Sequence, residues 1–178
     1  MPVGEPPVPY QSDPKGEFPL VPLDYAMHLT SSIGLMRDSA LDQGLRPLGL
    51  SVSRYRVLGV LVRFGVCRMT DLSNLTAMDR TSLTRIADHL VDKGLVTRAS
   101  NPKDRRQVSL DITEAGRAAH RDALAVVLSY NARILQGIPE TLQREAARTL
   151  QAMAANLAPN PGARDGIIYY ADPANDKD

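Results

Sequence analysis

Arginine and short hydroxyl side chains gather on one side of a helix predicted to run from Asp79 to Lys93. An arginine can bind the O6 and N7 atoms of guanine in the major groove of DNA, and short hydroxyls permit close approach to the backbone. These residue types therefore indicate recognition of a polyanion rather than catalysis. The predicted DNA-contacting side chains of this helix are Arg80, Thr81, Ser82, Thr84, Arg85 and Asp88.

A second basic group follows in the sequence Ser-Asn-Pro-Lys-Asp-Arg-Arg at residues 100–106, in which Lys103, Arg105 and Arg106 are further candidate contacts. The composition of this stretch is polar and turn-forming, as in a solvent-facing loop between two strands. Residues 78–106 hold seven basic and four acidic side chains, a net charge of +3, whereas the whole chain has a net charge of +1. The positive charge is thus concentrated where a nucleic acid would lie.

The elements that position these groups follow from the spacing of apolar residues. Helices are predicted over residues 23–43 and, after an N-cap at Ser51, over residues 51–65. A short third helix, capped by Thr70, presents Leu72 and Leu75 on one side. Asp79 caps the fourth helix, which ends at Gly94 in a left-handed conformation. Its packing stripe is formed by Leu83, Ile86, Ala87, Leu90 and Val91.

A change to alternating apolar residues predicts a strand over residues 108–112, with residues 95–99 as its partner and 100–106 as the loop between them. Thr113 is predicted to cap a fifth helix of roughly 25 residues that includes Ile138, and a sixth begins near Pro139 and runs to about residue 157. The order predicts a mainly α fold with a small β-hairpin wing: a winged helix-turn-helix domain plus a helical dimerisation region.

Composition and length place this domain in a soluble chain of 178 residues. Residues 1–22 hold seven of the thirteen prolines and are interpreted as an arm, and residues 158–178 as a C-terminal tail. The domain is expected over residues 23–157, with a DNA-binding lobe at about 51–113 and dimerisation helices at about 23–43 and 114–157. A secretory signal, a transmembrane run and an internal disulfide are all absent from the sequence, which predicts a cytoplasmic protein without membrane contact.

Several segments resemble the signature of the MarR (multiple antibiotic resistance regulator) family. They are Asp79–Ile86, Leu90–Val96, Asn101–Arg106 and Leu110–Gly116, and the resemblance is strong over residues 70–117. The wing sequence with Asp104 and Arg106, followed by a strand and Thr-Glu-Ala-Gly, is its most specific part. The flanking helices agree with the family in number and length over most of residues 23–157.

The resemblance implies a homodimer whose first, fifth and sixth helices intertwine, bound to double-stranded DNA as a transcriptional regulator, by default a repressor. Two-fold symmetry would set the two recognition helices roughly 34 Å apart and predicts a pseudo-palindromic operator. The N-terminal half of the fourth helix would enter the major groove, and the wing arginines the minor groove. We expect Asp104 to hold Arg106 and shape the wing, leaving open whether Arg105 or Arg106 inserts.

The resemblance also implies a small-molecule effector, in many such regulators an aromatic acid, bound between the dimer helices and the winged lobe. Tyr25, His28 and Ser32 share one side of the first helix, and Tyr55 on the second can face them. A phenol and an imidazole suit an organic carboxylate. These four residues are the candidate ligand pocket, with ordinary packing as the alternative.

Two alternative functions remain open. One is a winged-helix module that binds protein without specific DNA binding. The other is a redox-sensing regulator that uses Cys67, whose pKa Arg68 could lower although Phe64 and Val66 indicate a buried position. An enzyme is not expected, because His28, His89 and His120 lack metal-ligand spacing and the sequence has no nucleophile motif or phosphate-binding glycine loop. No cofactor or metal is predicted.

Overall fold

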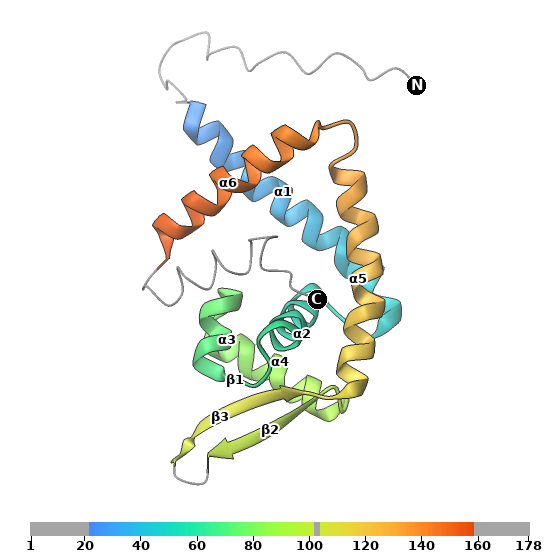
Figure 1. Cartoon of the computed structure of the whole chain (residues 1–178), viewed down its shortest axis with the longest axis vertical. Helices are drawn as coiled ribbons and strands as arrows, with labels where there is room; N and C mark the ends of the chain where they lie inside the picture. The colour runs from blue at the N-terminus through green and yellow to red at the C-terminus, as the bar shows by residue number, and fades with distance from the viewer. Residues whose placement is uncertain (1–21, 102–103, 159–178) are drawn as a thin grey trace. The chain divides into compact units, whose positions relative to one another are not determined.

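The computed structural model describes residues 22–101 and 104–158, and this part of the chain divides into two compact units between Ala40 and Leu41. The elements are α1 (Pro22–Leu45), η1 (Arg46–Leu48), α2 (Val52–Phe64), β1 (Cys67–Arg68), α3 (Met69–Thr76), α4 (Arg80–Asp92), β2 (Val96–Asn101), β3 (Asp104–Ile112), α5 (Glu114–Ile134) and α6 (Glu140–Leu157). This mainly helical fold with one small antiparallel sheet confirms the predicted class (Figure 1).

Three helices begin at the capping residues that the sequence predicts. The side chain of Ser51 accepts a hydrogen bond from the backbone N–H of Arg54 at 3.3 Å, and Asp79 accepts one from Ser82 at 2.9 Å. Thr113 accepts one from the backbone N–H of Gly116 at 3.0 Å. Each bond satisfies a donor that the first turn of a helix leaves unpaired, so α2, α4 and α5 start where the chain supplies a short oxygen-bearing side chain.

The hydrophobic core lies in the second unit and is made by the end of α1, with the buried Leu41 and Leu45, by α2, α3, α4 and the sheet, and by the middle of α5. Leu58 and Leu61 of α2 and Leu72 of α3 are fully buried, as are Leu83 and Leu90 of α4. The sheet adds Val96 and Leu110 and the fifth helix adds Ala123 and Val127. The predicted packing stripe of α4 is therefore confirmed, with Ile86 and Val91 partly buried against the core.

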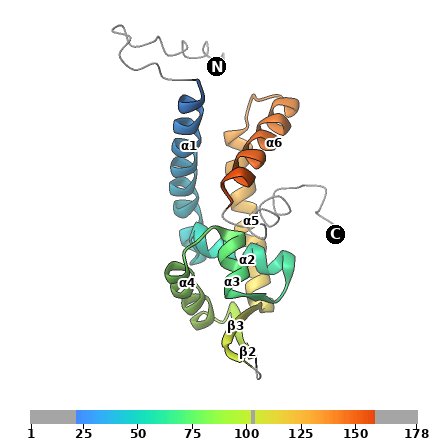
Figure 2. The same cartoon turned by 90° about the vertical axis from the view of Figure 1, so that its left-hand side faces the viewer.

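The sheet has three strands in the order β1-β3-β2, all antiparallel. The hairpin is longer than predicted, because Ser100 pairs with Val108 and Asn101 with Asp104, so most of the expected loop over residues 100–106 is strand. In both views β2 and β3 extend away from the helices of their unit (Figures 1 and 2). The strand β1, which the sequence analysis missed, pairs Cys67 with Leu110 and Arg68 with Ser109.

Two further predictions about helix boundaries are wrong. Thr70 does not cap α3, because that helix already begins at Met69 with Arg68 at the N-cap position and without a side-chain cap bond. The fifth helix has 21 residues and ends at Ile134, so Ile138 lies outside it, after Gly137 with a positive φ of 80°. Among the described helices, none is both long enough and apolar enough to cross a membrane.

Candidate nucleic-acid interface

The helix α4 has one face in the core and one face in solvent. Leu83, Ala87 and Leu90 are fully buried, at the three- and four-residue spacing that places them on one side of a helix. The predicted contact residues Arg80, Thr81, Ser82, Thr84, Arg85 and Asp88 are all exposed. The burial of one face thus fixes which face is presented, and the structure places these six side chains outside the core as predicted.

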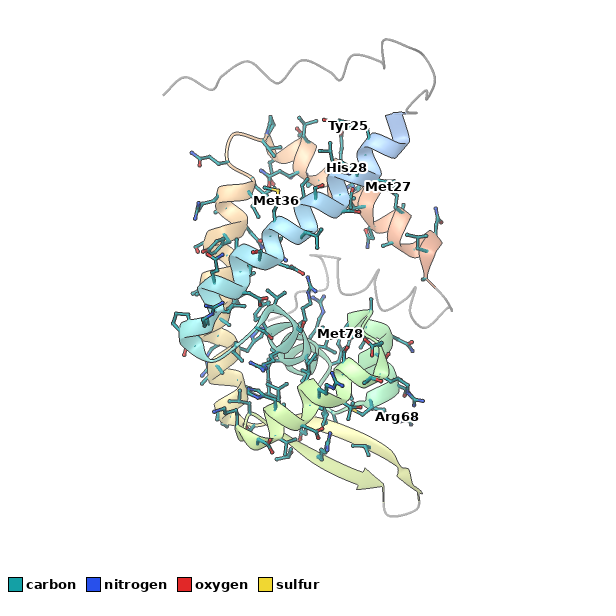
Figure 3. The ribbon with its side chains drawn as sticks, turned by 180° about the vertical axis from the view of Figure 1, so that it is seen from behind. Tyr25, Met27, His28, Met36, Arg68 and Met78 are labelled. Carbon is teal, nitrogen blue, oxygen red and sulfur yellow. The ribbon has the colours of Figure 1, made fainter. Side chains whose placement is uncertain are left out.

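A tight turn joins α3 to α4 and fixes the angle between them. Ala77 adopts a left-handed conformation with φ of 55°, which ends α3. The hydroxyl of Ser73 on α3 donates a 2.7 Å hydrogen bond to the backbone carbonyl of Met78, the residue labelled in this turn in Figure 3. Met78 is also packed against the core. This helix-turn-helix is therefore held both by packing and by a side-chain bond across the turn.

Hydrogen bonds organise the first turns of α4. The hydroxyl and backbone N–H of Ser82 both lower the pKa of the Asp79 carboxyl from its usual value, since they stabilise the ionised form. One turn later the hydroxyl of Thr84 donates to the carbonyl oxygen of Arg80 at 2.8 Å. Within the described residues neither Arg80 nor Arg85 forms an ion pair. Both side chains are exposed to solvent.

An ion pair that the sequence analysis did not foresee joins α4 to the hairpin. Arg98 Nη2 on β2 lies 2.8 Å from Asp88 Oδ1 on α4. Val96 is buried and Arg98 is two residues further along the strand, so both side chains leave β2 on the face that packs against α4. The alternation of side chains along a strand could have predicted that Arg98 shares a face with Val96. It could not have predicted Asp88 as the partner of Arg98, because that depends on how α4 and β2 pack.

The wing residues fall partly outside what the structure describes. Lys103 lies outside the described residues. Asp104, Arg105 and Arg106 form the start of β3 by their backbone, and their side chains also lie outside the described part. The support role of Asp104 and the minor-groove role of the arginines therefore stay predictions.

The candidate ligand residues lie in both units. Tyr25 and His28, labelled in Figure 3, lie on α1 before Leu41, as does Ser32. Tyr25 is 46% exposed. Tyr55 of α2 stacks on His120 of α5, with ring centroids 5.0 Å apart and an interplanar angle of 1°. Burial lowers the pKa of His120 and favours its neutral form.

A cavity of about 160 Å³ between α2 and α3 is lined by other residues, namely Arg56, Val60, Leu75 and Thr76. None of the four candidate ligand residues lines it. Their assignment to a ligand pocket therefore stays a prediction.

The environment of Cys67 does not favour a thiolate. Cys67 is buried in β1, and burial together with the nearby carboxylate of Asp71 raises the pKa of its thiol. The neighbouring Arg68 is exposed and does not reverse this direction. In the described part of the chain, no group of three or more His, Cys, Asp or Glu side chains is arranged to hold a metal ion.

Comparison with known proteins identifies the family. Residues 48–107 match the model of the MarR family. A MarR-family transcriptional regulator from Rhodococcus sp. RHA1 is 30% identical, with a TM-score of 0.69 over 75% of this chain and 95% of its own. CouR from Rhodococcus jostii RHA1, solved with p-coumaroyl-CoA bound, is also 30% identical, with a TM-score of 0.63 over 70% and 88% of the two chains.

The transcriptional repressor MdtR of Bacillus subtilis is 29% identical over 119 residues, which are 67% of this chain and 74% of MdtR. The family match over residues 48–107 covers α2, the helix-turn-helix, β2 and the start of β3. The chain belongs to the MarR family of helix-turn-helix transcriptional regulators, a family of regulators and not of enzymes.

Proposed function

We propose that this chain is a sequence-specific DNA-binding repressor that acts as a homodimer on a pseudo-palindromic operator and is released by a small molecule of the aromatic-acid class. The observation that supports it most directly is the division of α4 into a fully buried face and an exposed face with two arginines and three hydroxyl side chains. A recognition helix must satisfy a protein core and a DNA groove at once, and this distribution does so.

The spacing of the exposed residues supports entry of the first half of α4 into the major groove. Arg80, Thr81, Thr84 and Arg85 are spaced three and four residues apart, so they form one strip on the first two turns. An arginine on this strip can bind a guanine edge with two hydrogen bonds. The hairpin, with basic residues at its far end, would contact the flanking backbone.

Exposed apolar side chains support a homodimer. Leu142, Leu150 and Leu157 on α6 are 52%, 46% and 83% exposed, and α6 has no buried residue. In the other unit Leu35 and Met36 on α1 are more than two-thirds exposed. Large apolar side chains left exposed along a helix are typical of an interface. A second copy of the chain, related by two-fold symmetry, would cover these helices.

Support for an effector comes from the relative CouR, which was solved with p-coumaroyl-CoA bound. Tyr25, His28 and Ser32, spaced three and four residues apart on α1, offer a phenol, an imidazole and a hydroxyl to a ligand of this kind. Support for repression comes from MdtR, a transcriptional repressor. A reporter gene placed behind the operator should be less active in the presence of this chain than in its absence. Adding the effector should restore the activity when the chain is present.

The DNA-binding proposal is tested by selecting bound fragments from genomic DNA and measuring affinity over a salt series. Arg80→Ala or Arg85→Ala should weaken operator binding by about 1–3 kcal/mol. Replacing Arg105 and Arg106 together should flatten the salt dependence by about one unit per lost phosphate contact. Arg121→Ala, in an exposed position on α5, is the control and should bind normally.

Wild-type protein that fails to retain any duplex at low salt would instead favour the protein-binding module. The dimer is tested separately by light scattering of Leu150→Glu, which should dissociate the dimer. The matched variant Thr149→Glu, with the same charge on an exposed neighbour, should remain a dimer.

A thermal-shift screen with phenolic acids and their thioesters tests the effector. At least one compound is expected to raise the melting temperature, and this increase should be lost in Tyr25→Ala and in His28→Ala.

A further inference from the structure

The ion pair between Asp88 on α4 and Arg98 on β2 lies in solvent. The side chains are 52% and 37% exposed, and the nitrogen and oxygen atoms are 2.8 Å apart. An exposed pair of this kind contributes little to the free energy of unfolding, because water solvates both charges well and two side chains must be ordered. The pair therefore matters less for stability than for the charge of the surface, on α4 and the hairpin, that is proposed to contact DNA.

The position of the pair connects the two elements proposed to contact DNA. Asp88 lies on the exposed side of α4, eight residues after Arg80, and Arg98 lies on the first strand of the hairpin, opposite the buried Leu110. A guanidinium group between a recognition helix and a wing is well placed to reach a phosphate of the DNA backbone, whatever the base sequence. With Asp88 as its partner, the local charge of the pair is zero.

We propose that Asp88 is a specificity-determining residue, which holds the Arg98 guanidinium and so withholds one cation from sequence-independent phosphate binding. Discrimination depends on the ratio of operator binding to nonspecific binding, and the nonspecific term comes almost entirely from phosphate contacts. Removing one available cation therefore weakens nonspecific binding more than operator binding. The inference rests on the proposed DNA-binding function and differs from a direct contact of Asp88 with a base.

The test is a double-mutant cycle on the full chain with Asp88→Asn, Arg98→Gln and the combination of both. Each protein is titrated with a duplex of scrambled sequence and with the selected operator, by fluorescence anisotropy over a salt series. Asp88→Asn should raise affinity for the scrambled duplex about three- to tenfold and steepen its salt dependence by about one unit, as expected for one new phosphate contact. In the Arg98→Gln background the same substitution should leave the salt dependence unchanged.

Asp92→Asn is the matched control, because it removes the same charge from an exposed position of the same helix. It should leave the slope of the salt dependence unchanged. Equal effects of Asp88→Asn with and without Arg98, or equal effects of Asp88→Asn and Asp92→Asn, would overturn the inference in favour of simple charge removal. Loss of operator binding by Asp88→Asn, with scrambled binding unchanged, would overturn it in favour of base reading.

The cycle separates the inference from the proposed function. If wild-type protein binds neither duplex, the proposed DNA-binding function and the inference about Asp88 are both wrong. If wild-type protein binds in a salt-dependent manner but residues 88 and 98 show zero coupling, only the inference is wrong. Because both side chains are exposed, all variants are expected to fold, and circular dichroism melts that match wild type check this.

Discussion

Gly116, in the first turn of α5, lies so close to Leu95 that a Cβ atom on this glycine would be 2.0 Å from the backbone carbonyl oxygen of Leu95. That oxygen already accepts a hydrogen bond from the backbone N–H of Thr113 at 3.1 Å. A methyl group here must displace backbone, so Gly116→Ala should lower the free energy of unfolding by about 1–3 kcal/mol in denaturant titrations.

A control for this prediction lies one residue earlier. Ala115 is exposed in the same turn of α5, and Ala115→Ser should change stability by at most about 0.5 kcal/mol. Equal stability of Gly116→Ala and wild type would show that the close approach to Leu95 is not present in solution.

The cap of α4 gives a second prediction. Asp79→Ala removes the acceptor for the backbone N–H of Ser82, so it should lower both thermal stability and operator affinity. Asp79→Asn keeps an oxygen acceptor and should retain most of both. The pKa of Asp79 is lowered in the folded state, so its contribution is present above the unfolded-state pKa of about 4 and is lost as the pH falls. A melt series in which the asparagine and alanine variants behave alike would contradict the cap.

The stack of Tyr55 on His120 gives a prediction about pH. Burial lowers the pKa of His120 in the folded state, so the unfolded chain takes up this proton first as the pH falls below about 6.5. The folded state therefore loses stability as the pH falls through that range. His120→Phe keeps an aromatic ring beside Tyr55 and should show a smaller drop in melting temperature between about pH 8 and pH 5. An unchanged drop would exclude His120 as its source.

The thiol of Cys67 is expected to react slowly. Because burial and Asp71 raise its pKa, little thiolate is present at neutral pH, and a disulfide reagent should modify native protein far more slowly than urea-unfolded protein. Asp71→Asn should speed the native reaction. Peroxide should release no DNA from the wild type; release from wild type but not from Cys67→Ser would establish the redox-sensing alternative.

Features encoded within a few neighbouring residues could be predicted from the sequence. The caps at Ser51, Asp79 and Thr113 and the two faces of α4 depend on local side chains and on helical spacing, and the structure confirms them. The left-handed glycine at residue 94 is confirmed for the same reason.

Features set by distant pairing could not be predicted. The helix α3 begins directly after β1, whose two residues are fixed by pairing with Ser109 and Leu110 on β3. The start of α3 is therefore set by this pairing and not by a local cap at Thr70. The polar hairpin residues form strands because they pair with each other rather than with a core. Likewise, the partner of Asp88 is ten residues away on another element, and no periodicity indicates it. Gly137 was a local signal for the end of α5 that the interpretation of Ile138 overlooked.

The hydroxyl of Thr113 connects the end of α4 to the start of α5. It accepts the Gly116 N–H at the start of α5 and donates to the carbonyl of Gly94, two residues after the end of α4, at 2.8 Å. A single hydroxyl group thus couples the end of α4 to the start of α5. A displacement of the first turn of α5 would strain both bonds, so the end of α4 would have to follow it or the bonds would break.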